Sequence, residues 1–157
     1  FISNMSNAIS NQKKGKLFMK APEGSSVIAP IAINENHRFV AATFSSQDNK
    51  EKVTNKMLIF PIEELPVLPK GKGNKLISIS TKAFKEKTEF MMDVCCLAED
   101  SKLHIYHEGK TGGKTWTLKE LEEYISSRAK RGRVLPTGYN GQIKLEEIPR
   151  STEAAPE

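Results

Sequence analysis

A short basic loop with a central glycine occurs three times in this chain at almost constant spacing. The glycines are Gly15, Gly73 and Gly132, which lie 58 and 59 residues apart. A large apolar residue follows each of them, at Leu17, Leu76 and Leu135. Self-similarity at a fixed period is typical of arrays in which similar structural units stack and share a core. The spacing therefore predicts a repeated module rather than one irregular domain.

Short strand-like runs fill the intervals between the loops. They cover residues 27–33, 38–44 and 56–60 in the first interval, and residues 90–98, 102–107 and 114–118 in the second. Three or four short strands per copy indicate an all-β fold, a β-propeller-like array of antiparallel blades. We expect this array within residues 1–150, with repeat units beginning near residues 1, 60 and 118. Residues 151–157 are small, acidic and poor in apolar side chains, which predicts a disordered tail.

The apolar pattern also predicts which strands are buried. Residues 57–60 and 94–97 are apolar at consecutive positions, so both faces of these strands should be covered. Leu103 and Ile105 alternate with polar neighbours, as in a strand with one solvated face. Helical spacing predicts two or three helical turns between residues 117 and 129, opened by a capping box of Thr117 and Glu120. The larger aromatic residues in the strand runs are expected in the core: Phe18, Phe44, Phe60, Phe90 and Trp116.

Positive charge is concentrated in the three loops. Residues 13–16, 70–75 and 128–133 contain ten Lys or Arg and no acid, whereas the whole chain has a net charge of +5. The rest of the chain is therefore net negative, and the loops present cations to a polyanion or an acidic surface. A glycine among cations also lets backbone N–H groups approach phosphates. No aromatic residue is interleaved with the cations, which favours contact with a duplex backbone over base stacking and predicts no sequence-specific reading.

Other candidate sites are weaker. Cys95 and Cys96 are neighbours on a predicted strand and point to opposite faces, so we expect reduced thiols without a mutual bridge. Together with His104 and His107 they match no common zinc spacing. The segment 109–115 resembles a phosphate-binding loop, but Glu108 stands where the first glycine is needed. Adjacent acids such as Glu63 and Glu64 are expected to be solvated or paired with local lysines, so no catalytic residue, metal or cofactor is predicted for this chain.

Two segments carry a resemblance to a known family. Residues 57–79 and 117–136 resemble the C-terminal region of the A subunit of bacterial DNA topoisomerase IV, a type IIA topoisomerase related to gyrase. The sequence KGKGNK at 70–75 is its most specific part, and no glutamine-rich basic box of the gyrase type is present. The resemblance implies a β-pinwheel, with about two complete blades in this chain, whose basic rim binds and bends double-stranded DNA. The implied DNA-binding residues are Lys13, Lys14, Lys16, Lys70, Lys72, Lys75, Arg128, Lys130, Arg131 and Arg133.

The resemblance also implies a role within a larger enzyme. The parent protein would be an ATP-dependent isomerase acting in the bacterial cytoplasm at the nucleoid, where this region positions DNA for decatenation and relaxation. Its partners would be the B subunit of topoisomerase IV and a second copy of the A subunit, with no membrane involved. The catalytic tyrosine, ATP and Mg²⁺ would belong to other domains or to the partner protein. An alternative stays open, in which the propeller-like array is a protein-interaction platform that docks an acidic partner.

Overall fold

The computed structural model describes residues 1–47, 52–108 and 112–150. These contain seven strands, β1 (His37–Gln47), β2 (Val53–Pro61), β3 (Glu89–Ala98), β4 (Lys102–His107), β5 (Lys114–Thr117), β6 (Arg133–Val134) and β7 (Ile143–Ile148). The helices are η1 (Met5–Ala8), η2 (Ile62–Glu64), α1 (Thr81–Lys85) and η3 (Glu122–Tyr124). The prediction of an all-β fold is confirmed. In this part of the chain no helix has the length or apolar character needed to span a membrane.

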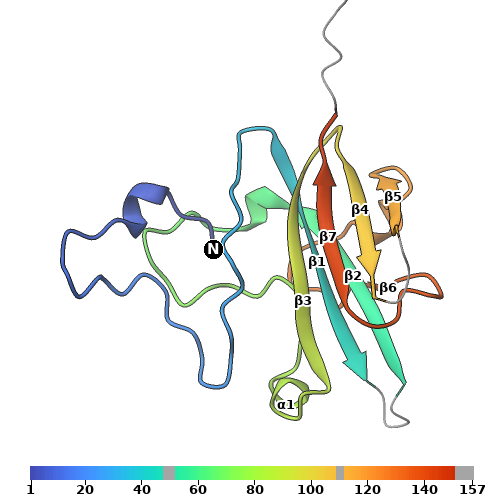
Figure 1. The fold of residues 1–157 in the computed structure, drawn as a ribbon, viewed down its shortest axis with the longest axis horizontal. Helices are drawn as coiled ribbons and strands as arrows, with labels where there is room; N and C mark the ends of the chain where they lie inside the picture. Colours follow the sequence, from blue (N-terminus) through green and yellow to red (C-terminus); the bar gives the residue numbers. More distant parts are fainter. Residues whose placement is uncertain (48–51, 109–111, 151–157) are drawn as a thin grey trace, which may run out of the picture.

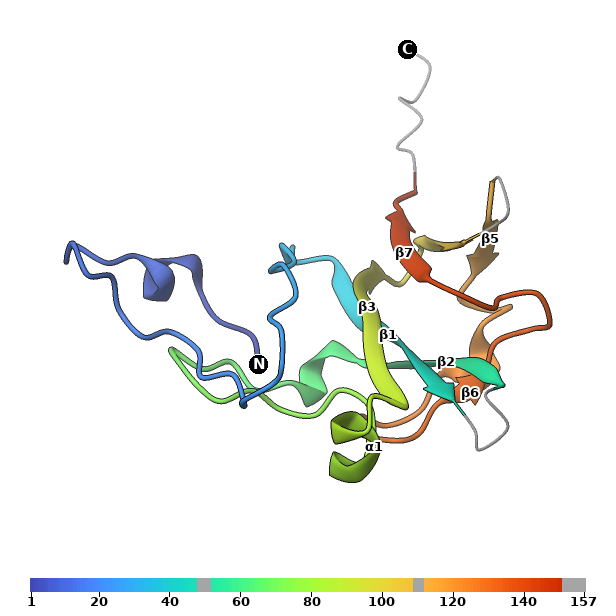
Figure 2. The same ribbon diagram turned by 60° about the horizontal axis from the view of Figure 1, so that its bottom comes forward.

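The strands form two antiparallel sheets. One has four strands in the order β3-β1-β2-β6, and the other has three in the order β5-β4-β7. Figures 1 and 2 show the two sheets packed against each other, with the N-terminal segment projecting to one side. In both views the green segment that follows β2 runs alongside this blue N-terminal segment.

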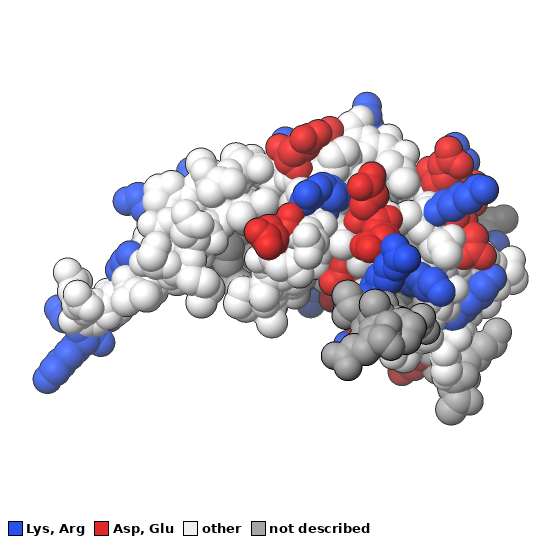
Figure 3. Space-filling model, turned by 90° about the horizontal axis from the view of Figure 1, so that it is seen from above, with Lys and Arg blue, Asp and Glu red and all other residues white. Residues whose placement is uncertain are grey.

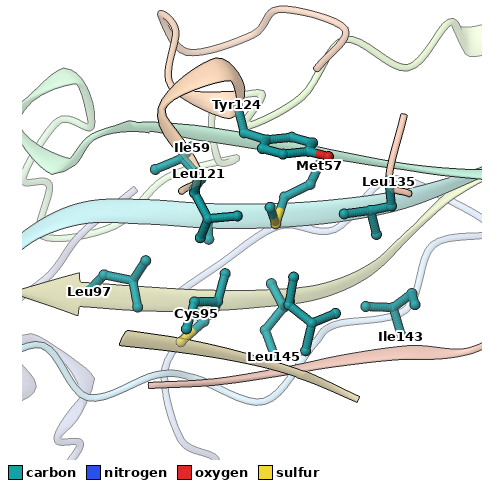
Figure 4. Close-up of a cluster of buried hydrophobic side chains, with 12 residues drawn as sticks. Met57, Ile59, Cys95, Leu97, Leu121, Tyr124, Leu135, Ile143 and Leu145 are labelled. Carbon is teal, nitrogen blue, oxygen red and sulfur yellow. The ribbon is translucent and has the colours of Figure 1, made fainter. Parts of the chain in front are cut away.

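Two hydrophobic clusters cover the four-stranded sheet on its two faces. The first lies between the sheets and includes Met57, Ile59 and Leu103 (Figure 4). The second lies on the opposite face, where Leu58 and Phe60 pack with side chains from residues 62–79. Residues 57 to 60 are at most 1% exposed, so the prediction that both faces of this strand are covered is confirmed. Leu103 and Ile105 are likewise buried on one face of β4, as predicted.

The two sheets share the same arrangement of strands, and we call each of them a blade. In the first blade β1 pairs with β2 and β3, and η2 follows β2. In the second blade β4 pairs with β5 and β7, and η3 lies shortly after β5. Strand β6, which begins at the last residue of the third basic loop, pairs with β2 and so extends the first blade from the next copy of the repeat. The described residues thus contain two blades, as the resemblance implied.

Several local predictions were wrong. Residues 27–33 form no strand, and their apolar side chains are exposed, for instance Val27 at 61%. Pro30 lacks a backbone donor, and both edges of β1 are already occupied by β2 and β3. Phe90 is 40% exposed rather than in the core, and Phe18 is only partly buried beside Phe1.

The predicted helix between residues 117 and 129 is reduced to turns and the single 3₁₀ turn η3. The capping box is nevertheless present, since the Thr117 N–H donates to Glu120 Oε2 at 2.8 Å and the Glu120 N–H donates to Thr117 Oγ1 at 3.3 Å. Leu121 and Tyr124 are buried in the first cluster, and the backbone then leaves the helical path because Ser126 N–H donates to Ile59 O. Tertiary packing therefore overrides helical spacing here. Residues 109–111 and the predicted tail 151–157 lie outside the described residues.

Candidate nucleic-acid interface

Backbone hydrogen bonds join consecutive copies of the repeat along two seams. The first seam links residues 1–20 to the second copy, and the second seam links residues 59–78 to the third. At the first seam Leu68 N–H donates to Ile2 O at 2.7 Å. At the second seam Ser126 N–H donates to Ile59 O at 2.8 Å. These bonds occupy equivalent places in the repeat.

Two more bonds recur in the same way beside the basic loops. At the first seam Gly71 N–H donates to Phe18 O at 3.4 Å, and at the second Ala129 N–H donates to Leu76 O at 2.9 Å. The Lys20 N–H then donates to Gly71 O at 3.3 Å. Its counterpart is the bond from Ser78 N–H to Lys130 O at 2.9 Å. The repeat inferred from three glycines is therefore also a repeat of backbone contacts.

The seams connect the three basic loops in order. Gly71, in the second loop, bonds to the segment that follows the first loop, and Lys130, in the third loop, bonds to the segment that follows the second. We call the ten cations of the loops the basic belt: Lys13, Lys14, Lys16, Lys70, Lys72, Lys75, Arg128, Lys130, Arg131 and Arg133. Figure 3 shows blue but no red side chains at the far end of the N-terminal segment in that view, whereas blue and red mix over the sheets.

The three loop glycines all have a positive φ. Gly15, Gly73 and Gly132 have φ values of 70°, 91° and 68°, in the left-handed region that favours glycine. A Cβ atom at Gly132 would lie 2.5 Å from Met57 O, whereas nothing lies within 4 Å of one at Gly15 or Gly73. The first two glycines are thus needed for φ alone, and Gly132 also for close approach to β2.

The seven lysines of the belt are exposed. Within the described part of the chain none of them has a side-chain hydrogen bond or ion pair. Their ammonium groups are therefore free to bind phosphate oxygens.

Arg131, by contrast, is engaged inside the protein. Its Nη1 donates to Glu89 Oε2 at 2.8 Å and its Nη2 donates to Glu89 Oε1 at 2.6 Å, which makes a bidentate ion pair. Its Nη1 also donates to Ser78 O at 3.1 Å. The hydrogen bonds from Arg131 lower the pKa of Glu89 against the opposing effect of burial, and the same bonds raise the pKa of Arg131. The guanidinium also lies 5.3 Å from the centre of the Phe44 ring.

Arg128 is engaged as well. Its backbone N–H donates to Glu64 Oε2 at 2.9 Å, its Nε donates to Glu64 O at 3.0 Å, and its Nη1 donates to Lys75 O at 2.8 Å. Arg133 Nη1 lies 3.5 Å from Glu123 Oε2 in an exposed pair. Sequence reasoning treated Glu64 as solvated or paired with a local lysine and assigned no role to Glu89. No local sequence pattern indicates these pairings, because Glu64 and Glu89 lie 64 and 42 residues from their arginines.

The thiols behave as predicted. Cys95 and Cys96 are free and buried, and they belong to the hydrophobic clusters on opposite faces of the first sheet. Among the described residues no group of three or more His, Cys, Asp or Glu side chains could hold a metal ion.

Antiparallel blades that stack through repeated seams, with a basic loop beside each seam, define a propeller-like array of the β-pinwheel class. The fold comparison supports this class. The structure of the E. coli ParC C-terminal domain superposes with a TM-score of 0.75, at 24% sequence identity, over 93% of this chain and 55% of that one.

Sequence comparison gives the particular relationship, although no family model matches the chain. The A subunit of DNA topoisomerase 4 from Haemophilus influenzae is 29% identical over 94% of this chain, and that from Pseudomonas aeruginosa is 31% identical over 81%. The chain spans only 18% and 16% of the length of these relatives. It is therefore similar, in sequence and fold, to the C-terminal β-pinwheel region of the A subunit of bacterial DNA topoisomerase IV.

Proposed function

We propose that this chain is a DNA-binding and DNA-bending domain of the A subunit of a topoisomerase IV. The observation that carries the proposal is the set of seven exposed, unpaired lysines placed beside successive seams. A duplex that follows the belt meets these lysines in turn, and each phosphate contact releases condensed counterions. Bending tens of base pairs costs about 1–6 kcal/mol, which these contacts offset.

The whole protein then acts as an ATP-dependent isomerase in the bacterial cytoplasm, at the nucleoid. In that setting the domain positions a duplex for passage through an active site elsewhere in the assembly. The names of the relatives support this role, because each is the A subunit of a topoisomerase. The B subunit, a second copy of the A subunit, ATP and Mg²⁺ enter through parts of the assembly outside this chain.

The test is fluorescence anisotropy with a labelled duplex of about 40 base pairs across a salt series. If about five phosphates are engaged, the slope of log K against log salt is about −4 to −5. The variant Lys70→Ala/Lys72→Ala/Lys75→Ala should weaken binding and flatten the slope. A matched control, Lys85→Ala/Lys119→Ala/Lys144→Ala, removes three exposed lysines outside the belt and should change both far less.

Two results would overturn the proposal. One is binding that does not respond to salt, and the other is equal loss in the belt and control variants. If DNA binding is absent and an acidic protein partner is still captured after nuclease treatment, the chain is an interaction platform instead. Bending is measured separately, by energy transfer between dyes on the two ends of the duplex, which should rise on binding.

A further inference from the structure

We infer that Arg128 and Arg131 are positioning residues that fasten the second seam and so align the lysines on either side of it, rather than residues that bind phosphate. This inference rests on the proposed DNA-binding function. It separates these two arginines from the seven unpaired lysines of the basic belt by what their guanidinium groups already contact.

Within the described chain, every side-chain hydrogen bond of these two arginines crosses from the third copy to the second. Arg128 donates to Glu64 O and Lys75 O, and Arg131 donates to Ser78 O and to both carboxylate oxygens of Glu89. The Glu89 side chain is only 9% exposed, whereas that of Arg131 is 46% exposed. A buried carboxylate holds its hydrogen-bonded arginine firmly, because separation leaves much of the charge uncompensated. The Nε and Nη1 groups of Arg128 and the Nη1 and Nη2 groups of Arg131 thus already donate within the protein before any DNA arrives.

The carbonyl groups that accept these hydrogen bonds lie in the basic belt or close to it. Arg128 holds the carbonyl of Lys75, the last cation of the second loop, and Arg131 holds the carbonyl of Ser78. Ser78 in turn donates its N–H to Lys130 O, in the third loop. The two arginines therefore tie Lys75 to Lys130, so that the unpaired lysines of two loops keep a fixed relation.

The first seam serves as an internal comparison. The seam bonds match Ala129 to Gly71, so Arg128 corresponds to Lys70, and the loop glycines match Gly132 to Gly73, so Arg131 corresponds to Lys72. Neither lysine has a side-chain partner in the described chain. The two recurrent seam bonds beside the loops are 3.4 and 3.3 Å long there, against 2.9 Å for both at the seam with the arginines. The same loop positions thus hold phosphate-binding lysines at one seam and seam-fastening arginines at the other.

The experiment pairs equivalent positions in the 157-residue chain. DNA binding of Arg128→Ala and Arg131→Ala is measured across a salt series beside Lys70→Ala and Lys72→Ala. A lost phosphate contact reduces the steepness of the salt slope by about 0.9 per lysine. We expect this loss for the lysine variants, and an affinity loss of about three- to tenfold with an unchanged slope for the arginine variants. Equal slope losses at equivalent positions would overturn the inference.

Glu89→Gln is an independent test, because it breaks the ion pair with Arg131 and leaves the positive charge of Arg131 in place. If Arg131 positions the belt, this variant binds DNA more weakly than the parent chain. If Arg131 binds phosphate, removal of a neighbouring carboxylate leaves affinity equal or higher, which would contradict positioning.

Hydrogen exchange in the free protein keeps the inference testable without DNA. Arg128→Lys and Arg131→Lys preserve charge and serve where an alanine variant fails to fold. Either should accelerate exchange at the amides of Ser78, Ser126 and Ala129, with no change at those of Leu68 and Gly71 in the first seam. Unchanged exchange at the second seam would refute the fastening role. Absence of DNA binding by the parent chain would instead refute the proposed function, and exchange alone would then decide whether the arginines fasten the seam.

Discussion

Cys95 and Cys96 illustrate how burial sets chemistry at single positions. Burial raises the pKa of the Cys95 thiol to about 12 and that of Cys96 to about 11. Since the thiolate is the reactive form, both thiols should be inert in the folded protein. We expect negligible reaction with a disulfide reagent at pH 8 and stoichiometric reaction of two thiols after unfolding in guanidinium. Rapid labelling under native conditions would show that the core opens around β3.

The pair of Glu89 and Arg131 gives stability a defined pH dependence. Because the pKa of Glu89 is lower in the folded than in the unfolded state, its contribution is complete above the unfolded pKa of about 4.3 and disappears as pH falls through the folded pKa. We expect Glu89→Gln to lower the free energy of unfolding by about 1–3 kcal/mol at pH 7. The difference from the parent chain should shrink below about pH 4.5.

Chemical denaturation at several pH values measures this difference. Glu86→Gln is the matched control, because Glu86 is 55% exposed and lies 3.9 Å from Lys82 in a surface pair. Its effect should stay within about 0.5 kcal/mol at every pH. A constant difference for Glu89→Gln down to pH 3 would show that the carboxylate is not held ionised by Arg131.

Gly73 and Gly132 differ in their surroundings, because Gly73 lies in an open turn whereas Gly132 packs against β2. Both have positive φ, so Gly→Ala at Gly73 should cost about 1 kcal/mol through backbone strain alone. At Gly132 the added Cβ would also meet Met57 O at 2.5 Å, so β6 must move away from β2. We expect Gly132→Ala to cost at least about 2 kcal/mol more. Thermal unfolding of both variants measures the difference, and equal losses would show that the loop shifts freely.

The sequence predicts some strands well, but it predicts others poorly and does not predict the pairing of Arg131 with Glu89. The runs at residues 38–44, 56–60 and 102–107 are dense in apolar or β-branched residues, and each became part of a strand. Strand β7 was missed because its alternation of Ile143 and Leu145 with charged neighbours is short and follows a glycine-rich turn. Residues 27–33 were mispredicted because an apolar run without a pairing partner stays irregular. The pairing of Arg131 with Glu89 depends on the fold, so no local pattern indicates it.

The two blades differ in the character of one equivalent face. This face of the first blade contacts the second blade, whereas the same face of the second blade points away from the first. In the first blade Ala41, Met57 and Ile59 face the second blade and belong to the first cluster. The equivalent hairpin positions in the second blade are Lys102, Thr115 and Thr117, which are exposed or partly exposed. The neighbouring His104 Nδ1 and Thr115 Oγ1 are hydrogen bonded at 2.6 Å, and Tyr106 donates to Glu146 at 2.7 Å. A face with its own polar pairs resembles the capping units of repeat arrays, which need no further unit to cover them.

This contrast predicts that stacking depends on three side chains. The substitutions Lys102→Ala, Thr115→Met and Thr117→Ile give the second blade the residues of the first at equivalent positions. The new apolar patch should drive self-association, because burying it releases about 25 cal/mol per Å² of apolar surface. Sedimentation velocity should show a concentration-dependent dimer for the triple variant and none for a control with Lys102→Ala alone. If the parent chain already associates, and charged substitutions at Thr115 and Thr117 abolish that association, the polar face is itself an interface rather than a cap.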